Sequence, residues 1–310
     1  MFRTAFLFPG QGSQSVGMGK DFYDLAPAAR EIFMKADEAL RFKISKLCFE
    51  GPEAELKLTE NTQPALLTVS FIAYLLLGKE PQIAAGHSLG EYSALVAAGC
   101  LRFEDAILLV HKRGKYMQEA VAVGEGAMAA VLGADFKEVE SALQKIGKGV
   151  VEIANWNSQE QIVIAGEREA VKEALILINP PRSVILPVSA PFHCRLMKSA
   201  EEKLSSDLDQ MEFRDLKFPV ITNVDARIIH RGEEARDALK RQVTRPVLWY
   251  SSMEKLGQEK VEVLVELGPG RVLSGLAKRI CREWTSPRRV MNAEDTEGLE
   301  KVREFLSGML

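Results

Sequence analysis

The sequence predicts an α/β protein in which helices cover a mainly parallel sheet. Short apolar runs bounded by Gly or Pro alternate with longer segments of helical periodicity, a pattern typical of such a sheet. One internal stretch has a different order of elements. The chain has 310 residues, of which 46% are hydrophobic and 27% charged, so it can bury a full core in one large domain or two smaller ones.

The elements of the parallel sheet can be placed in chain order. Each expected strand is a short apolar run, and each expected helix is a longer segment with a repeating apolar stripe. We expect strands at 3–8, 82–86, 218–222 and 261–267. Between them we expect helices at 22–40, 63–77, 89–99, 103–122, 194–210 and 271–283, the last one beginning just after Gly268-Pro269-Gly270.

The stretch with the different rhythm has the order β-α-β-β-α-β. Asp135 and Glu138 have the spacing of a capping box, which marks the start of its first helix. We expect strands at 127–132, 150–155, 161–165 and 183–187, and helices at 135–146 and 167–178.

This order is that of the split-βαβ or ferredoxin-like fold. We therefore expect a small ferredoxin-like subdomain at 124–192, inserted into a large domain formed by 1–123 and 193–310. Glycines and prolines near 124–126 and 187–191 mark the two junctions. Residues just outside these junctions would line a cleft between the two units.

Charge and cysteine content exclude several classes of partner. The formal charge of -3 gives no global basic field, so we expect no nucleic acid partner. The four cysteines show no C-x-x-C spacing, which indicates neither a zinc site nor a disulfide framework and favours the cytoplasm. The N-terminus has no signal-peptide pattern, and no stretch is apolar enough to span a membrane.

A candidate nucleophile lies in Gly86-His87-Ser88-Leu89-Gly90. An apolar run precedes this G-x-S-x-G motif and a helical segment follows it, which is the context of a nucleophile elbow. The glycines allow a tight turn that would present Ser88 at the end of the strand. The backbone N–H of Leu89, at the start of the helix, could then face an oxyanion.

A serine hydroxyl needs a base, and histidine is the usual one near neutral pH. His87 is adjacent to the serine, His230 lies in a charged loop, and His111 falls within an amphipathic helix, so these three are poor candidates. His193 follows a proline-stiffened segment where the chain leaves the expected insert. By elimination, His193 is the best candidate for the base.

Two further features suit acyl chemistry. Arg113 lies 25 residues after Ser88 on the next expected helix, and its planar guanidinium could hold a carboxylate in two hydrogen bonds. After the first strand comes the glycine-rich loop Pro9-Gly10-Gln11-Gly12-Ser13-Gln14. This loop lacks the third glycine of the dinucleotide fingerprint, but it could bring Gln11 close to the elbow as part of an oxyanion hole.

Taken together, ordered motifs along nearly the whole chain resemble the malonyl-CoA:acyl carrier protein transacylases and, more broadly, the acyltransferase domains of fatty acid and polyketide synthases. The motifs that carry the resemblance are Phe8-Pro9-Gly10-Gln11-Gly12-Ser13-Gln14, Asn61-Thr62-Gln63-Pro64-Ala65, Gly86-His87-Ser88-Leu89-Gly90-Glu91, Arg113, Asn157-Ser158, Gln161-Ile162-Val163-Ile164-Ala165-Gly166, Pro191-Phe192-His193, Arg245-Pro246-Val247-Leu248-Trp249 and Glu266-Leu267-Gly268-Pro269-Gly270.

The resemblance implies a large domain like an α/β-hydrolase core with a ferredoxin-like insert. It implies malonyl transfer from coenzyme A to the phosphopantetheine thiol of an acyl carrier protein, for fatty acid synthesis, with no metal and no further cofactor. It also implies roles: Ser88 as nucleophile, His193 as base, Gln11 and Leu89 as oxyanion-hole donors, Arg113, Gln63 and Phe192 as substrate-binding residues, and the main-chain carbonyl of Leu248 as the group that orients the histidine.

Two positions depart from the family pattern: Leu248 stands where many relatives have glutamine, and Cys194 where serine is common. We expect a monomer whose acidic carrier partner meets the basic residues of the last long helix and beyond, Lys278, Arg279, Arg282, Arg288 and Arg289.

Two other functions stay open from the residues alone. An esterase or thioesterase would have an Asp or Glu between Ser88 and His193 in sequence to orient the base. A non-catalytic module would use the turn as a pantetheine pocket.

Overall fold

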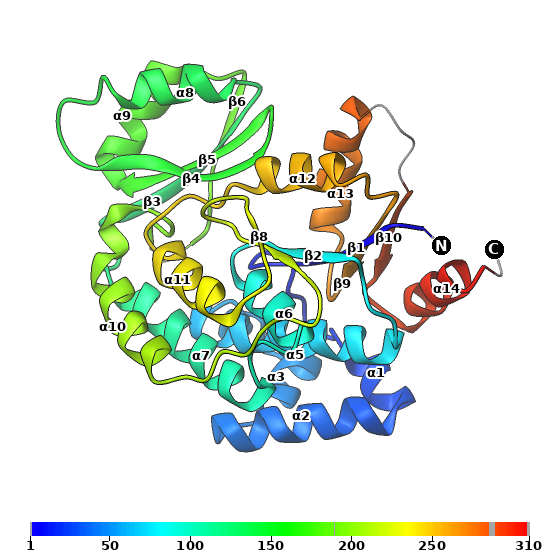
Figure 1. Cartoon of the computed structure of the whole chain (residues 1–310). Helices are drawn as coiled ribbons and strands as arrows, with labels where there is room; N and C mark the ends of the chain where they lie inside the picture. The colour runs from blue at the N-terminus through cyan, green and yellow to red at the C-terminus, as the bar shows by residue number, and fades with distance from the viewer. Residues whose placement is uncertain (1, 189, 285–288, 309–310) are drawn as a thin grey trace.

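A six-stranded sheet runs through the larger part of the molecule (Figure 1). The computed structural model describes residues 2–188, 190–284 and 289–308. The strands lie in the order β10-β9-β1-β2-β7-β8, and every neighbouring pair is parallel except β7 with β8. Their bounds are β1 (Thr4–Phe8), β2 (Ile83–Gly86), β7 (Val220–Ile221), β8 (Ile228–Ile229), β9 (Val263–Leu267) and β10 (Arg289–Ala293).

Helices cover both faces of this large sheet. Phe6 and Phe8 of β1 belong to the main core, whereas Ala5 and Leu7 belong to a second core on the other face, because side chains alternate along a strand. The main core includes residues of α5 (Thr59–Leu77), α6 (Leu89–Ala97) and α7 (Phe103–Glu119). The second core includes residues of α12 (Trp249–Gln258) and α13 (Val272–Ile280).

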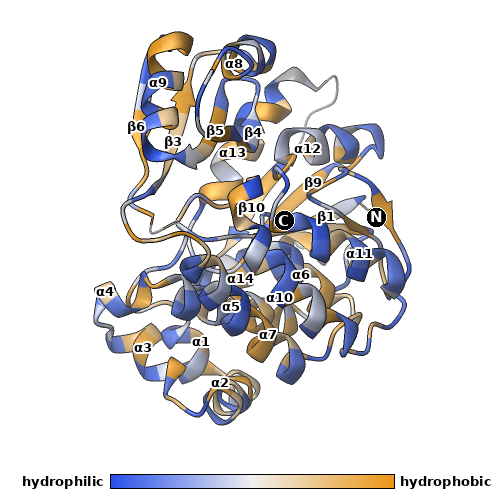
Figure 2. Ribbon diagram, turned by 90° about the vertical axis from the view of Figure 1, so that its left-hand side faces the viewer, coloured by the Kyte–Doolittle hydropathy of each residue, from blue (hydrophilic) through white to orange (hydrophobic). Residues whose placement is uncertain are grey.

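A four-stranded antiparallel sheet stands at one end of the molecule with α8 and α9 (Figure 2). Its strand order is β4-β5-β3-β6, and the chain passes through it as β-α-β-β-α-β, the expected order. Asp135 and Glu138 form the predicted capping box. The elements are β3 (Gly126–Leu132), α8 (Phe136–Leu143), β4 (Val151–Ser158), β5 (Gln161–Glu167), α9 (Arg168–Ile178) and β6 (Arg182–Ile185).

The small sheet is tied to the rest of the chain through its edge strand. The N–H of Trp156 donates to the carbonyl of Val247, and the N–H of Val247 donates to the carbonyl of Ala154, both at 2.9 Å. The segment before α12 thus extends the ladder of β4. This pairing holds the segment that follows α11 (Gly232–Gln242) against the small sheet.

In two of the expected helices, proline explains how the observed bounds differ from the prediction. The helix expected at 22–40 is divided into α1 (Lys20–Leu25) and α2 (Pro27–Leu40), because Ala26 is extended in front of Pro27. The helix expected at 63–77 starts at Thr59, so Pro64 lies inside it.

Pro64 has no N–H for the carbonyl of Glu60, four residues earlier. That carbonyl is instead bonded to the Nδ1 atom of His111 at 2.9 Å. The bond satisfies the freed carbonyl and gives His111 a structural role.

Several further elements are not among those predicted from the sequence. Besides β8, β10, α11 and α12, they are α3 (Ile44–Glu50), α4 (Glu53–Leu56) and α14 (Thr296–Leu306). The helix expected at 194–210 consists of η1 (Arg195–Met197) and α10 (Lys198–Asp209), and the one expected at 271–283 consists of α13 and η2 (Cys281–Glu283). Among the described helices, none combines the length and the apolar character that crossing a bilayer requires.

Candidate active site

The turn between β2 and α6 holds Ser88 in a strained conformation, with φ 51° and ψ -105°. Its flanking glycines are required by close backbone contacts. A Cβ atom at Gly86 would lie 1.9 Å from the carbonyl carbon of Gly90, and one at Gly90 would lie 1.9 Å from the carbonyl oxygen of Phe8. The predicted tight strand-turn-helix is therefore confirmed, and no residue but glycine fits at either position.

Ser88 and His193 meet at this turn although they are 105 residues apart. The serine Oγ lies 2.8 Å from Nε2 of the imidazole. His193 is 4% exposed and has a positive φ of 59°. Burial, followed by the positive charge of Arg113, lowers the pKa of His193 to about 3. The imidazole is therefore neutral around pH 7 and able to accept a proton.

The group that orients His193 differs from the expectation. The Nδ1 atom bonds to the main-chain carbonyl of Gln242 at 2.9 Å. The carbonyl of Leu248 accepts instead from the N–H and the hydroxyl of Ser252, because Leu248 caps the start of α12. The assignment of Leu248 as the histidine-orienting residue is therefore wrong, although the kind of group, a main-chain carbonyl, was right.

The other three histidines are engaged elsewhere or lie apart from Ser88. His87 is bonded through Nε2 to Oδ1 of Asn157 at 2.8 Å, and burial lowers its pKa. His111 is bonded to the carbonyl of Glu60. His230 lies exposed after β8. His193 is thus the only histidine whose ring contacts the Ser88 hydroxyl among the described residues.

Arg113 of α7 lies in the same buried centre and is 1% exposed. Its Nη2 donates to Ser88 Oγ at 3.1 Å and to Gln242 Oε1 at 2.8 Å. Its Nη1 donates to Gln63 Oε1 at 2.8 Å, and its guanidinium carbon lies 5.2 Å from the centre of the Tyr92 ring. Burial lowers the pKa of Arg113, whereas Tyr92 and Glu91 raise it.

The partners of Arg113 are neutral amides and a hydroxyl, and its Nε finds no partner among the described residues. A buried guanidinium in this state retains its capacity to bind an anion.

Gln63 and Phe192 occupy different environments. Gln63 is 1% exposed, accepts from Arg113, and donates to the sulfur of Met117 at 3.8 Å. Phe192 is 6% exposed and packs in the main core directly before His193. The structure thus brings Gln63 to the guanidinium, whereas Phe192 is a buried residue of the main core next to His193 in the chain.

The loop after β1 lies against the elbow, as expected. A Cβ atom at Gly10 would be 2.3 Å from the carbonyl oxygen of His87, so the two backbones touch. Leu89 is the first residue of α6, and its N–H donates to no other group in the described part of the chain. The same holds for the N–H of Gln11, whose side chain donates to Thr59 Oγ1 at 3.3 Å.

Three further residues of the site were not predicted from the sequence: Gln242, Asn223 and Glu91. The Asn223 side chain accepts from the N–H of Ser88 at 2.6 Å and donates to the carbonyl of Gly86 at 2.7 Å, which braces the turn. Gln242 could have been found, because it continues the buried stripe Ala235, Ala238 and Leu239 of α11 at helical spacing. A glutamine on such a stripe requires buried partners.

A cavity of about 530 Å³ opens beside the elbow, between the large sheet and the small one. The loop after β1, His87 and the N-terminal half of α13 form one side, and the inner face of the small sheet forms the other. Polar groups project into it from both sides, among them Gln11, Asn155, Asn157, Gln161 and Arg279.

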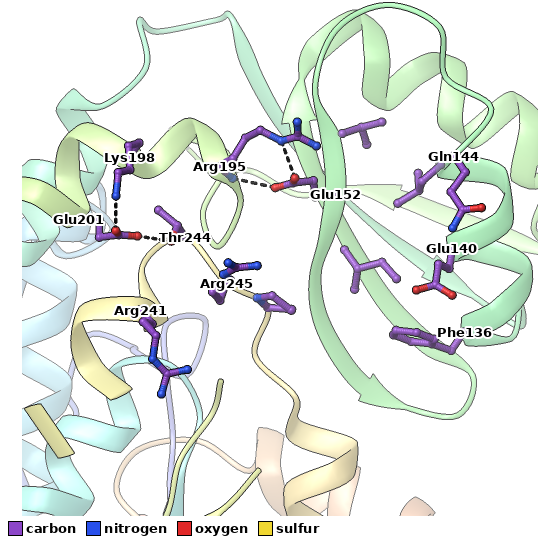
Figure 3. A pocket seen from close by; sticks show the side chains of 14 residues that line it. Phe136, Glu140, Gln144, Glu152, Arg195, Lys198, Glu201, Arg241, Thr244 and Arg245 are labelled. Atoms are coloured by element: carbon purple, nitrogen blue, oxygen red, sulfur yellow. Dashed lines mark hydrogen bonds and ion pairs between the residues drawn. The ribbon is translucent and has the colours of Figure 1, made fainter. Parts of the chain in front are cut away.

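A second hollow, of about 720 Å³, lies at the edge of the small sheet (Figure 3). Its charged side chains are mostly paired: Arg195 donates to Glu152 at 2.5 Å, and Lys198 donates to Glu201 at 2.5 Å. The Arg195–Glu152 pair joins the loop after His193 to β4. This ion pair therefore ties the segment that follows His193 to the small sheet.

The basic residues proposed for a carrier surface are spread over several elements. Lys278 and Arg279 lie exposed in the last turn of α13, and Arg282 lies exposed in η2. Neither Lys278 nor Arg282 forms an ion pair within the described residues, whereas Arg289 packs 4.1 Å from the ring centre of Phe305. Arg288 lies outside the described residues.

Comparison with known proteins places the chain in a family. The model of the acyl transferase domain matches residues 5–298. The chain is 48% identical to a malonyl CoA-acyl carrier protein transacylase of Bacillus subtilis, with 99% of this chain and 98% of the relative covered. The transacylase of the same name in Escherichia coli K12 is 47% identical, over 92% of this chain and 95% of the relative.

Solved structures agree with the sequence relatives. A malonyl CoA-acyl carrier protein transacylase of Coxiella burnetii superposes with a TM-score of 0.94 at 40% identity, covering 98% of this chain and 97% of the other. A malonyl-transacylase in complex with a type II PKS acyl-carrier protein gives 0.94 at 42% identity, covering 98% and 99%. The chain therefore belongs to the acyl transferase domain family and, within it, to the malonyl CoA-acyl carrier protein transacylases.

Proposed function

We propose that this protein transfers a malonyl group from malonyl-CoA to the phosphopantetheine thiol of an acyl carrier protein, for fatty acid synthesis, through an ester on Ser88. One observation carries the proposal: the Ser88 hydroxyl lies between a neutral imidazole at 2.8 Å and a buried guanidinium at 3.1 Å. The first group suits a base, and the second suits a carboxylated acyl group.

The transfer proceeds in two steps, acylation of Ser88 and transfer of the acyl group to the carrier thiol. As Ser88 Oγ attacks the thioester carbonyl, its proton passes to Nε2 of His193; the C–S bond then breaks, and the coenzyme A sulfur takes that proton. In the second step the carrier thiol gives its proton to His193 and attacks the ester, and the C–O bond breaks as Ser88 regains the proton. Neither step needs a metal or a further cofactor.

The other site residues stabilise charge or select the acyl group. The N–H groups of Leu89 and Gln11 would donate to the oxyanion, since neither is committed to a partner in the described chain. Arg113, held by Gln63, would bind the malonyl carboxylate. Phe192, packed before His193, would leave little room for an α-substituent.

The architecture suggests how the substrates reach Ser88. We assign 1–123 and 193–310 to an α/β-hydrolase-like domain and 124–192 to a ferredoxin-like insert, since the small sheet has the order β4-β5-β3-β6. The pantetheine arms of both substrates would enter by the cavity between the sheets. We expect a monomer that acts in the cytoplasm, where coenzyme A thioesters and carrier protein meet.

An esterase is less well supported, because it calls for a carboxylate on the imidazole. His193 Nδ1 bonds to a main-chain carbonyl. This geometry supports the transferase.

The ester on Ser88 can be tested by intact mass measurement after mixing with malonyl-CoA. We expect one malonyl adduct that disappears when holo carrier protein is added. The Ser88→Ala variant should gain none, whereas Ser93→Ala on the same helix should gain it normally. An adduct on Ser88→Ala would refute the nucleophile, and binding of malonyl-CoA without any adduct in the wild type would favour a non-catalytic pantetheine module.

A further inference from the structure

Glu91 is a buried carboxyl group for which the proposed mechanism has no use. It is 0% exposed and lies three residues after Ser88, in the first turn of α6. It forms no ion pair within the described residues, although burying an unpaired carboxylate is costly. Its Oε2 accepts from Gln242 Nε2 at 2.7 Å and from the N–H of Asn223 at 3.0 Å.

The side-chain amide of Gln242 connects Glu91 to the guanidinium. Its Nε2 donates to Glu91 Oε2 and to the carbonyl of Ser88 at 3.1 Å, while its Oε1 accepts from Arg113 Nη2 at 2.8 Å. The two ends of an amide have nearly the same shape, so their chemistry decides which way the group points. Glu91 Oε2 is an acceptor, since it also accepts from the N–H of Asn223, and the guanidinium of Arg113 only donates; the NH₂ end of the amide therefore faces Glu91 and its oxygen faces Arg113.

The inverted amide would direct an NH₂ group at the guanidinium, where two donors would oppose each other. Arg113 would then lose one of the two amide oxygens that hold it, since the other is Gln63 Oε1. The direction of the Gln242 amide thus helps to fix the direction of the guanidinium.

Glu91 also balances the charge of Arg113 without neutralising it by contact. Burial raises the pKa of Glu91 to about 7, and the bonds from Gln242 and Asn223, together with the charge of Arg113, act in the opposite direction. The interposed amide keeps the carboxylate from pairing directly with the guanidinium. The charge of Arg113 is therefore not neutralised by a contacting carboxylate within the described residues, and its partners Gln63, Gln242 and Ser88 are all neutral.

We propose that Glu91 is a positioning residue: acting through the side chain of Gln242, it orients Arg113 and so sets the preference for a carboxylated acyl donor. This inference rests on the proposed malonyl transfer. It assigns Glu91 to acyl selection, in addition to any part in the structure of the turn.

The test compares the kcat/KM values for malonyl-CoA and acetyl-CoA in a double-mutant cycle. Glu91→Leu and Gln242→Leu should each lower the malonyl:acetyl ratio by about tenfold or more, since a hydrogen bond to a charged group is lost. The Gln242 carbonyl that holds His193 remains in the leucine variant. The malonyl:acetyl ratio of the double variant should be no lower than that of the single variants, because Glu91 acts through Gln242.

Two more variants make the result interpretable. Glu91→Gln keeps an acceptor for Gln242 and Asn223, so it should lose less of the ratio than Glu91→Leu and provides a folded protein if the latter is unstable. Asp37→Asn is the matched control, since it changes a carboxylate that is 8% exposed and bonded to Ser45, and it should leave the ratio unchanged.

Equal losses of kcat/KM for malonyl-CoA and for acetyl-CoA would overturn the role of Glu91. So would a double variant whose loss in the malonyl:acetyl ratio is the product of the two single losses. Failure of this inference is distinguishable from failure of the proposed function. If the wild type forms no malonyl adduct, the function itself is wrong; if it does and the ratios do not change, only the role of Glu91 is wrong.

Discussion

At the scale of single residues, the site consists of a few polar groups whose chemistry is set by burial. The strained serine lies within hydrogen-bond distance of both the neutral imidazole and the buried guanidinium. Because His193 and Arg113 are buried, each bond that they make is stronger than it would be in water, and each one left unmade is costly. Substitutions here should therefore affect stability as well as selectivity and pH dependence.

Arg113→Ala should reduce malonyl transfer by on the order of 100-fold or more, since a hydrogen bond to a charged group contributes about 1.5–3 kcal/mol and the buried guanidinium can form two with a carboxylate. Acetyl transfer should change far less, because an acetyl group offers no carboxylate. Parallel assays with malonyl-CoA and acetyl-CoA measure the difference. Equal losses with both donors would mean that Arg113 is structural.

The reaction of Ser88 with a neutral sulfonyl fluoride should stay base-assisted well below pH 6.5. The pKa of His193 is lowered to about 3 in the folded protein, so the imidazole remains neutral as the pH falls through its ordinary value. Rates of inactivation between pH 4.5 and 8 measure this. A midpoint at or above pH 6.5 would contradict the prediction.

The lowered pKa of His193 also makes the stability of the fold depend on pH. The unfolded chain takes up a proton on this histidine near pH 6.5, whereas the folded chain does not, so the contribution of His193 to the free energy of unfolding should fall as the pH drops below 6.5. Replacing His193 by glutamine should remove this part of the acid sensitivity, as urea unfolding at pH 5 and pH 8 would show.

At the scale of elements, the turn from β2 to α6 depends on close contacts between backbone segments, which leave no room for a side chain at Gly86 or Gly90. Helix α5 depends on a side chain instead: Pro64 leaves the carbonyl of Glu60 without its helical partner, and His111 bonds to that carbonyl. Local patterns predicted these elements, whereas their exact ends depend on such tertiary contacts.

Gly90→Ala should lower the free energy of unfolding by about 3 kcal/mol or more, because its Cβ would meet the carbonyl of Phe8 and force backbone to move. Gly147→Ala provides the control, since a Cβ there has nothing within 4 Å and its φ is ordinary, and it should change stability by less than about 1 kcal/mol. Urea unfolding of both variants would measure the difference, and similar values for the two would contradict it.

At the scale of the whole molecule, two sheets enclose the cavity beside Ser88, and α13 carries cations next to it. An acidic carrier protein would approach such a face faster than a neutral one, because opposite charges steer association. The proposed docking surface consists of Lys278, Arg279 and Arg282.

Lys278→Glu combined with Arg282→Glu should raise the apparent KM for carrier protein by about tenfold at low salt and leave the KM for malonyl-CoA nearly unchanged. Arg279 is left unchanged in this variant because it lines the cavity. Lys145→Glu with Lys148→Glu is the matched control, because these two exposed cations lie beyond α8 in the small sheet's loop. Steady-state kinetics with each substrate varied in turn separate the effects. Identical KM values for carrier protein in both double variants would show that Lys278 and Arg282 are incidental.

The sequence by itself determined the alternation of strands and helices, the β-α-β-β-α-β stretch and the tight turn at Ser88, because periodicity, capping and glycine spacing are local properties. It also singled out Ser88, His193 and Arg113. Only the tertiary structure decided which groups surround them. Glu91 lies far along the chain from Asn223 and Gln242, and only folding brings the three together. The carbonyl that holds His193 belongs to Gln242 rather than to Leu248. Main-chain carbonyls and amides are the same at every residue, so only the folded backbone selects which of them meets the histidine.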